Sequence, residues 1–163
     1  MGAKTMRNVI YTAAFIDLPQ WDNTAPMDIK RLLDVTSQKL GMGILPNVYL
    51  HHMTVAFRPT EFEYNQLDYG KETNLYIVGV VGNKKAQAFL VETVLPVKNK
   101  YPHITISTAD GVSPAYSNQL FEQEKVVQLV DPIEIVTKIG WFDGRQRNYN
   151  RLMTEVERHV SQR

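Results

Sequence analysis

The sequence predicts an α+β domain that is built mostly of antiparallel sheet. About seven segments are rich in β-branched and aromatic residues, and only two longer segments carry apolar residues at helical spacing. The two kinds of segment do not alternate strictly, as they would in a parallel α/β protein. No linker, low-complexity stretch or long repeat divides the 163 residues, so we expect a single domain over 1–163.

The predicted strands are bounded by turn-forming residues. Gly82, Asn83 and Lys84 lie between two β-rich segments and are typical of a hairpin turn. The predicted strands cover 8–16, 46–58, 74–81, 85–94, 101–107, 125–130 and 133–141.

Two amphipathic segments predict the longer helices, over 27–40 and 147–160. Pro26 suits the first turn of the earlier helix, and Gly41 suits its end. The remaining segments predict loops, with one short helical turn in the second of them; these loops cover 17–26, 59–71 and 108–118.

Composition limits the classes of function. The chain has 18 basic and 17 acidic side chains, so its net charge of +1 argues against a protein that grips a long nucleic acid. Cysteine is absent, which excludes disulfides, a thiolate nucleophile and cysteine-based metal sites. No apolar run reaches the roughly 18 residues of a membrane helix. We therefore expect a soluble, cytoplasmic, monomeric protein without a membrane partner.

A short motif, His-x-Thr, occurs twice in predicted strands. The copies are His52-Met53-Thr54 and His103-Ile104-Thr105. With four histidines in the chain, roughly 0.3 such matches are expected by chance. Two matches, both in strands and both with an apolar residue between the polar pair, indicate a paired functional motif.

Strand geometry places each motif pair on one face, because side chains two residues apart point the same way. His52 and Thr54 therefore point together, and we expect Met53, Val55 and Phe57 to point into the core.

The same alternation places His103, Thr105 and Ser107 on one face of the second strand. It also separates His51 from His52, since adjacent strand residues point apart, so we expect His51 on the apolar side or at a rim. A three-histidine zinc site is thereby disfavoured, and we expect no metal and no cofactor.

Two histidines that face one cleft can act as general base and general acid, because imidazole titrates near neutral pH. Each threonine hydroxyl can donate a hydrogen bond to a non-bridging oxygen of a phosphate. This set of groups suits in-line attack at a phosphodiester, especially a strained 2′,3′-cyclic phosphate. The sequence leaves open which histidine is the base.

The doubled motif resembles that of the 2H phosphoesterase superfamily. The stretch PHITISTADGVSPAYSN is similar to the second-motif region of the cyclic phosphodiesterase domain of fungal tRNA ligases. The resemblance implies a bilobal α+β fold with sheets around a central cleft. It also implies His52, Thr54, His103 and Thr105 as the catalytic quartet.

Two substrate classes remain open within this resemblance. One is a 2′,3′-cyclic phosphate at the end of RNA or on a nucleotide. The other is a 2′–5′ or 3′–5′ linked oligonucleotide or cyclic signal, of the kind that phage enzymes of the superfamily degrade to evade host immunity. The motifs are 51 residues apart, which implies a trimmed first lobe. A non-catalytic nucleotide-binding module of the same fold is the further alternative.

Other residues are candidates for contacts with the substrate. Aromatic rings suit stacking on a base, and polar or cationic groups suit ribose and phosphate. Core packing or turn formation is the ordinary alternative for each of them. These candidates are Tyr11, Phe57, Tyr101, Ser107, Tyr116, Trp141 and Arg145.

Overall fold

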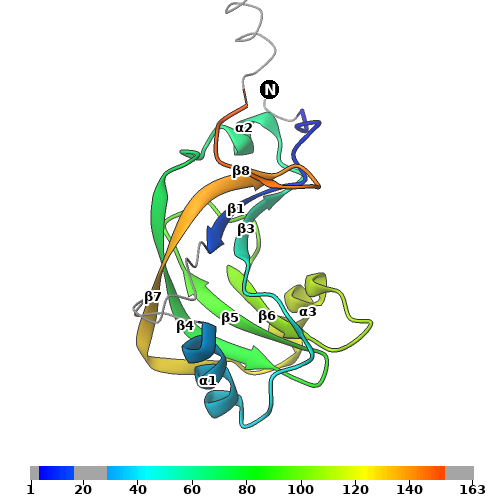
Figure 1. Cartoon of the computed structure of the whole chain (residues 1–163), viewed down its shortest axis with the longest axis vertical. Coiled ribbons are helices and arrows are strands. Elements are labelled where there is room, and N and C mark those ends of the chain that lie inside the picture. Colours follow the sequence, from blue (N-terminus) through cyan, green and yellow to red (C-terminus); the bar gives the residue numbers. More distant parts are fainter. Residues whose placement is uncertain (1–3, 17–28, 153–163) are drawn as a thin grey trace, which may run out of the picture.

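The computed structural model describes residues 4–16 and 29–152, and its core is a closed barrel of six antiparallel strands (Figure 1). Around the barrel the strands follow the order β1, β3, β6, β5, β4, β7, and β7 pairs back with β1. They are β1 (Tyr11–Ile16), β3 (His52–Phe57), β4 (Glu72–Gly82), β5 (Ala86–Glu92), β6 (His103–Thr108) and β7 (Val127–Phe142). The short strands β2 (Asn47–Val48) and β8 (Arg147–Asn148) extend the sheet from β6 and β7.

Helices cover both ends and one side of the barrel. Figure 1 shows α1 (Ile29–Leu40) at one end, α2 (Glu61–Tyr64) with β8 at the other, and α3 (Ser117–Gln123) at the side, where Leu120 and Phe121 pack against Ala86 and Ala88 of β5. Hydroxyl side chains start two of the helical segments. Thr60 forms a capping box with Glu63 at α2, and Ser113 caps the 3-10 turn Pro114–Tyr116 that leads into α3.

The barrel interior is apolar. Alternate residues of the strands point inward and lose all contact with solvent, as Leu75, Ile77, Phe89 and Ile104 show. Removing these side chains from water is the main force that closes the sheet. Within the described residues no helix is long and apolar enough to cross a membrane.

The structure confirms the mixed α+β content and the antiparallel sheet. The hairpin at Gly82–Lys84 is present, and the Asn83 side chain accepts hydrogen bonds from the backbone of Lys85 and Ala86. Of the helix expected over 27–40, residues 29–40 form α1, and 27–28 lie outside the described residues. The loop expected at 17–26 also lies outside them.

Three predictions about the elements are wrong. The two strands expected at 125–130 and 133–141 form one long strand, β7, with an outward bulge near Pro132. The helix expected from residue 147 begins instead as β8, because Asp143 and Gly144 turn the chain back on β7. Residues 153–160 of that expected helix lie outside the described residues. The loop expected at 108–118 ends early, since α3 starts at Ser117.

Candidate active site

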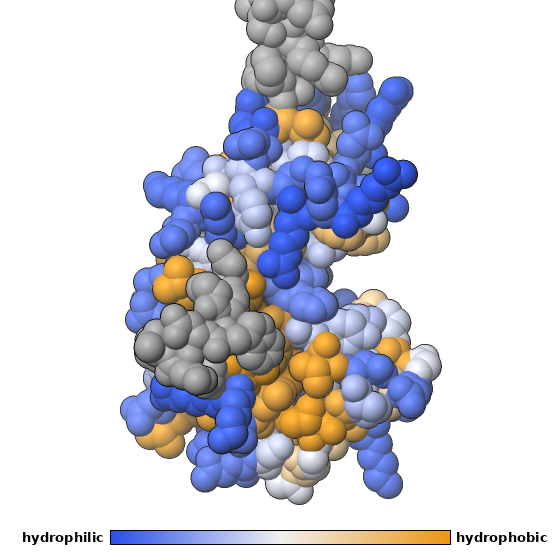
Figure 2. All heavy atoms as spheres, viewed as in Figure 1, coloured by the Kyte–Doolittle hydropathy of each residue, from blue (hydrophilic) through white to orange (hydrophobic). Residues whose placement is uncertain are grey.

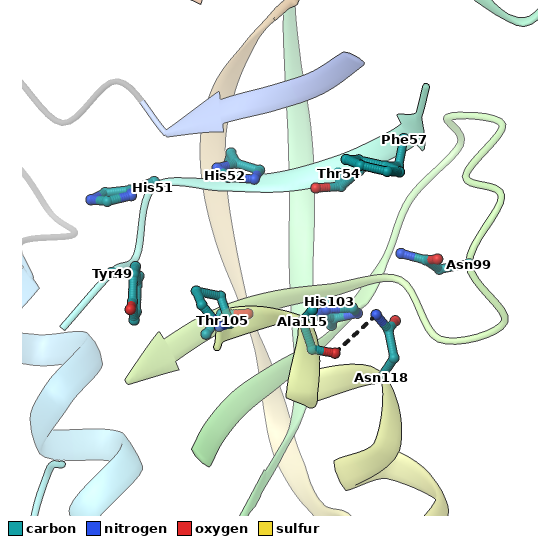
Figure 3. A pocket seen from close by; sticks show the side chains of 11 residues that line it. Tyr49, His51, His52, Thr54, Phe57, Asn99, His103, Thr105, Ala115 and Asn118 are labelled. Atoms are coloured by element: carbon teal, nitrogen blue, oxygen red, sulfur yellow. Dashed lines mark hydrogen bonds between the residues drawn. The ribbon is translucent and has the colours of Figure 1, made fainter. Parts of the chain in front are cut away.

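The two His-x-Thr motifs meet where β3 and β6 touch. One register pair joins these strands, and it joins the middle residues of the motifs, Met53 and Ile104. Both are fully buried, so the polar residues on either side of them point to the opposite face. Because the strands are antiparallel, His52 lies across from Thr105 and Thr54 across from His103, as Figure 3 shows.

A one-residue bulge follows each motif. In β3, Thr54 pairs with Ala13 and Ala56 with Thr12, which leaves Val55 without a partner across from it. In β6 the pairings of Thr105 and Ser107 with β5 likewise leave out Ile106. A bulge reverses the alternation of the residues beyond it. The two motifs therefore share a backbone irregularity as well as their sequence.

These bulges overturn two expected orientations. Phe57 does not point into the core: it is 64% exposed and lines the pocket beside Thr54. Ser107 does not share the face of His103 and Thr105, since it is fully buried and donates a hydrogen bond to Gln87 Oε1 at 2.5 Å. The structure thus brings Phe57 to the site and removes Ser107 from it.

The chain also departs from the regular strand just before the first motif. Between the pairs Val48–Ser107 and Met53–Ile104, four residues of one strand face two of the other. Leu50 takes up this excess with a φ of 53°, a left-handed conformation that costs on the order of 1 kcal/mol in a residue with a Cβ. As a result Tyr49 and His51 both reach the pocket.

The two motifs line one open pocket of about 430 Å³. Figure 2 shows the surface hollowed on the side where α3 lies in Figure 1. No acidic side chain is among the described residues that line the pocket, and this favours an anionic ligand. The lining residues are Tyr49, His51, His52, Thr54, Phe57, Asn99, His103, Thr105, Pro114, Ala115 and Asn118.

His52 lies in an environment that disfavours its charged form. Its ring stacks on Tyr11, with centroids 4.6 Å apart, and its Nδ1 is buried without a hydrogen-bond partner among the described residues. Burial, helped by the charges of His51, Arg147 and His103, lowers the pKa of His52 to about 3. His52 is therefore neutral at physiological pH.

His103 has a partner that favours the charged form. Its Nδ1 donates to the carbonyl of Tyr101 at 2.7 Å, which directs Nε2 away from the backbone. Burial lowers the pKa of His103, and the bond to Tyr101 opposes that shift. The two histidines thus face one pocket with unequal tendencies to hold a proton.

Thr105 is oriented by Ser117, the first residue of α3. The two hydroxyl oxygens are 2.9 Å apart. Either hydroxyl could be the donor in this bond. Because Ser117 is fully buried and Thr105 is the one side chain that hydrogen-bonds with it among the described residues, we assign the donor role to Ser117. Thr105 accepts that bond, and its own hydrogen is left to point into the pocket.

Arg147 places a positive charge behind the first motif. Its guanidinium lies 4.7 Å from the Phe15 ring centroid and donates long hydrogen bonds to the carbonyls of Ile16 and His51. Phe15 in turn contacts the His52 ring. The sequence did not indicate a role for Arg147 at the site, because residues 147–160 were expected to form a helix.

The other candidate residues occupy different positions. None of the five lines the pocket, although the Tyr11 ring contacts His52, which does. The Tyr101 ring stacks on Phe121, and the Tyr116 hydroxyl donates to Gln123. Trp141 is buried, with its Nε1 bonded to the carbonyl of Asn150, and Arg145 is an exposed residue of the turn after β7.

Sequence reasoning missed Tyr49 and Asn99 as pocket residues. The Asn118 amide donates to the carbonyl of Ala115, which holds it at the rim.

Within the described residues, no group of three His, Asp or Glu side chains is placed to hold a metal ion.

The comparison with known families gives one result. Residues 47–136, more than half of the chain, match the model of the fungal tRNA ligase phosphodiesterase domain. The chain belongs to this family. The matched segment of the phosphodiesterase domain contains both His-x-Thr motifs and the strands β3 to β6 that carry and connect them. Membership in this 2H family indicates a phosphodiesterase whose substrates are RNA or nucleotides. No curated protein matches the chain significantly.

Proposed function

We propose that the protein hydrolyses nucleotide phosphodiesters, in particular 2′,3′-cyclic phosphates, by metal-independent catalysis with two histidines. The observation that carries this proposal is the single register pair between Met53 and Ile104, which puts both motifs on one pocket. We take this pocket as the counterpart of the central cleft that the family resemblance implies. The phosphate lies between the motifs, and Thr54 and Thr105 donate hydrogen bonds to its non-bridging oxygens.

In this mechanism His52 is the general base and His103 the general acid. His52 takes a proton from water, whose oxygen forms a bond to phosphorus in line with the leaving oxygen. The bond from phosphorus to the leaving ribose oxygen breaks, and His103 gives that oxygen a proton. A bound phosphate raises the pKa of both rings, because an adjacent anion favours the imidazolium.

The unequal surroundings of the two rings support this assignment. The Tyr101 carbonyl stabilises the proton on Nδ1 of His103, whereas Nδ1 of His52 has no described acceptor. Pairs of groups whose surroundings separate their proton affinities divide naturally into an acid and a base.

Substrates with different leaving groups test the roles. A nitrophenyl phosphodiester needs little acid assistance, because nitrophenolate is a stable anion. We expect His103→Ala to retain much of its activity on this ester and to lose it on a cyclic phosphate. His52→Ala should lose activity on both. The opposite pattern would reverse the assignment.

A binding assay separates the enzyme from a non-catalytic binding module. The double variant His52→Ala/His103→Ala should lose turnover and keep most of its affinity for a nucleoside 2′-monophosphate. A wild-type protein that binds this ligand without turning over any diester would contradict the enzymatic proposal. Degradation of oligonucleotide immune signals is the alternative role, and the same assay with those substrates examines it.

A further inference from the structure

The aromatic residues of the pocket lie at both of its ends. In Figure 3 the four motif residues occupy the middle, with Tyr49 and His51 to one side and Phe57 and Asn99 to the other. A terminal 2′,3′-cyclic phosphate has a nucleoside on one side of its phosphorus and only the attacking water on the other. One aromatic end would be enough for such a substrate.

The Tyr49–His51 end is available to a ligand. The two rings meet edge to face, with centroids 5.8 Å apart, so ring surface remains for stacking. His51 is exposed overall, but its ring is partly covered by neighbouring atoms; this partial burial, together with the charge of Arg147, lowers the pKa of His51 and favours the neutral ring. The Tyr49 hydroxyl accepts a long bond from Thr108, and its own hydrogen is available to a ligand.

The backbone provides a second, independent observation. Leu50, a buried residue with a Cβ, is held in the left-handed conformation between Tyr49 and His51. Strained residues of this kind concentrate at ligand sites, where the surrounding structure maintains them. The Tyr49 and Leu50 amides are fixed by the carbonyls of Ile106 and Thr105, so the irregular segment is anchored on the second motif strand.

We propose that Tyr49 and His51 form a second nucleobase subsite, so that the pocket also accepts a dinucleoside phosphodiester with a nucleoside on each side of the scissile phosphorus. Stacking on aromatic rings suits any base. The proposal rests on the phosphodiesterase function. Hydrolysis adds the water oxygen to phosphorus and releases one nucleoside as an alcohol, and the other nucleoside retains the phosphate.

The test compares kcat/KM for 2′,3′-cyclic AMP with that for 2′–5′ and 3′–5′ linked ApA, in the presence of EDTA. We expect the wild type to cleave at least one ApA linkage. Tyr49→Ala should lower the ratio of ApA to cyclic AMP turnover by about tenfold, the loss of one stacked base. Tyr49→Phe should keep the ratio, and so should Val48→Ala, the matched control in β2 outside the pocket.

The outcomes separate this inference from the proposed function. Cleavage of cyclic AMP alone would overturn the second subsite and leave the phosphodiesterase standing. Equal losses on all substrates in Tyr49→Ala would also overturn it, because Tyr49 would then support the fold only. Cleavage of no substrate would overturn both.

Discussion

Replacing Ser117 with alanine removes the bond that orients the Thr105 hydroxyl. In the assignment made above, the fully buried Ser117 donates to Thr105, and Thr105 in turn donates toward the proposed phosphate position. Without Ser117 the Thr105 hydroxyl can rotate, and the orientation that the transition state requires must be selected from several. A net hydrogen bond is worth about 0.5–1.5 kcal/mol, so we expect kcat to fall about two- to tenfold.

A double-mutant cycle shows whether the effect passes through Thr105. Turnover of 2′,3′-cyclic AMP is measured for the wild type, Ser117→Ala, Thr105→Val and the double variant. The Ser117→Ala loss should disappear in the Thr105→Val background, because the hydroxyl that it orients is absent. Ser113→Ala is the matched control, since this exposed serine caps the same segment by accepting from the Ala115 amide at 3.2 Å. An equal loss in both backgrounds would refute the reasoning and leave Ser117 as a packing residue of α3.

Three further predictions concern protons and metals. The unfolded chain protonates His52 below about pH 6.5 and the folded protein only below about 3, so stability falls as the pH drops through that window. In urea unfolding, the free energy of unfolding should fall less steeply with decreasing pH for His52→Gln than for the wild type, by at most about 1.4 kcal/mol per pH unit. Equal pH dependence of the two proteins would contradict a buried neutral ring. Burial is the main cause of the low pKa of His52, and the charge of Arg147 contributes to it. Arg147→Gln should therefore move the acidic limb of the kcat/KM profile to higher pH. An acidic limb at the same or a lower pH would contradict this contribution of Arg147. Turnover should persist in EDTA, and a loss that zinc or magnesium restores would contradict the metal-independent mechanism.

Strand alternation was enough to predict how each motif pair is presented. It correctly separated His52 and Thr54 from Met53, and His103 and Thr105 from Ile104, because a buried middle residue fixes its neighbours on the opposite face. Beyond each motif the alternation no longer predicts which face a side chain is on, because a bulge follows.

The wrong predictions of side-chain orientation come from backbone irregularities that the sequence does not indicate. Val55 and Ile106, the bulged residues, are ordinary strand formers, so nothing in their identity predicts the reversal that exposes Phe57 and buries Ser107. Leu50 is likewise a residue type that rarely adopts a positive φ.

Contacts between segments that are far apart in the sequence could not be predicted either. Arg147 lies behind the first motif because a turn at Asp143 folds β8 onto β7, and its contacts join residues about a hundred positions apart. Ser117 meets Thr105 because a short loop and the 3-10 turn Pro114–Tyr116 lead from the second motif strand into the short helix α3. Helices of this length carry little periodicity from which to predict them.

The most direct measurement of the central claim is a product assay in EDTA. Wild type and His103→Ala are incubated with 2′,3′-cyclic nucleotides and with RNA that ends in a cyclic phosphate, and the products are identified by chromatography and mass. The account predicts conversion to a monoester, with the gain of one water, by the wild type and not by the variant. Equal conversion by both proteins, or none by the wild type under any condition, would contradict it.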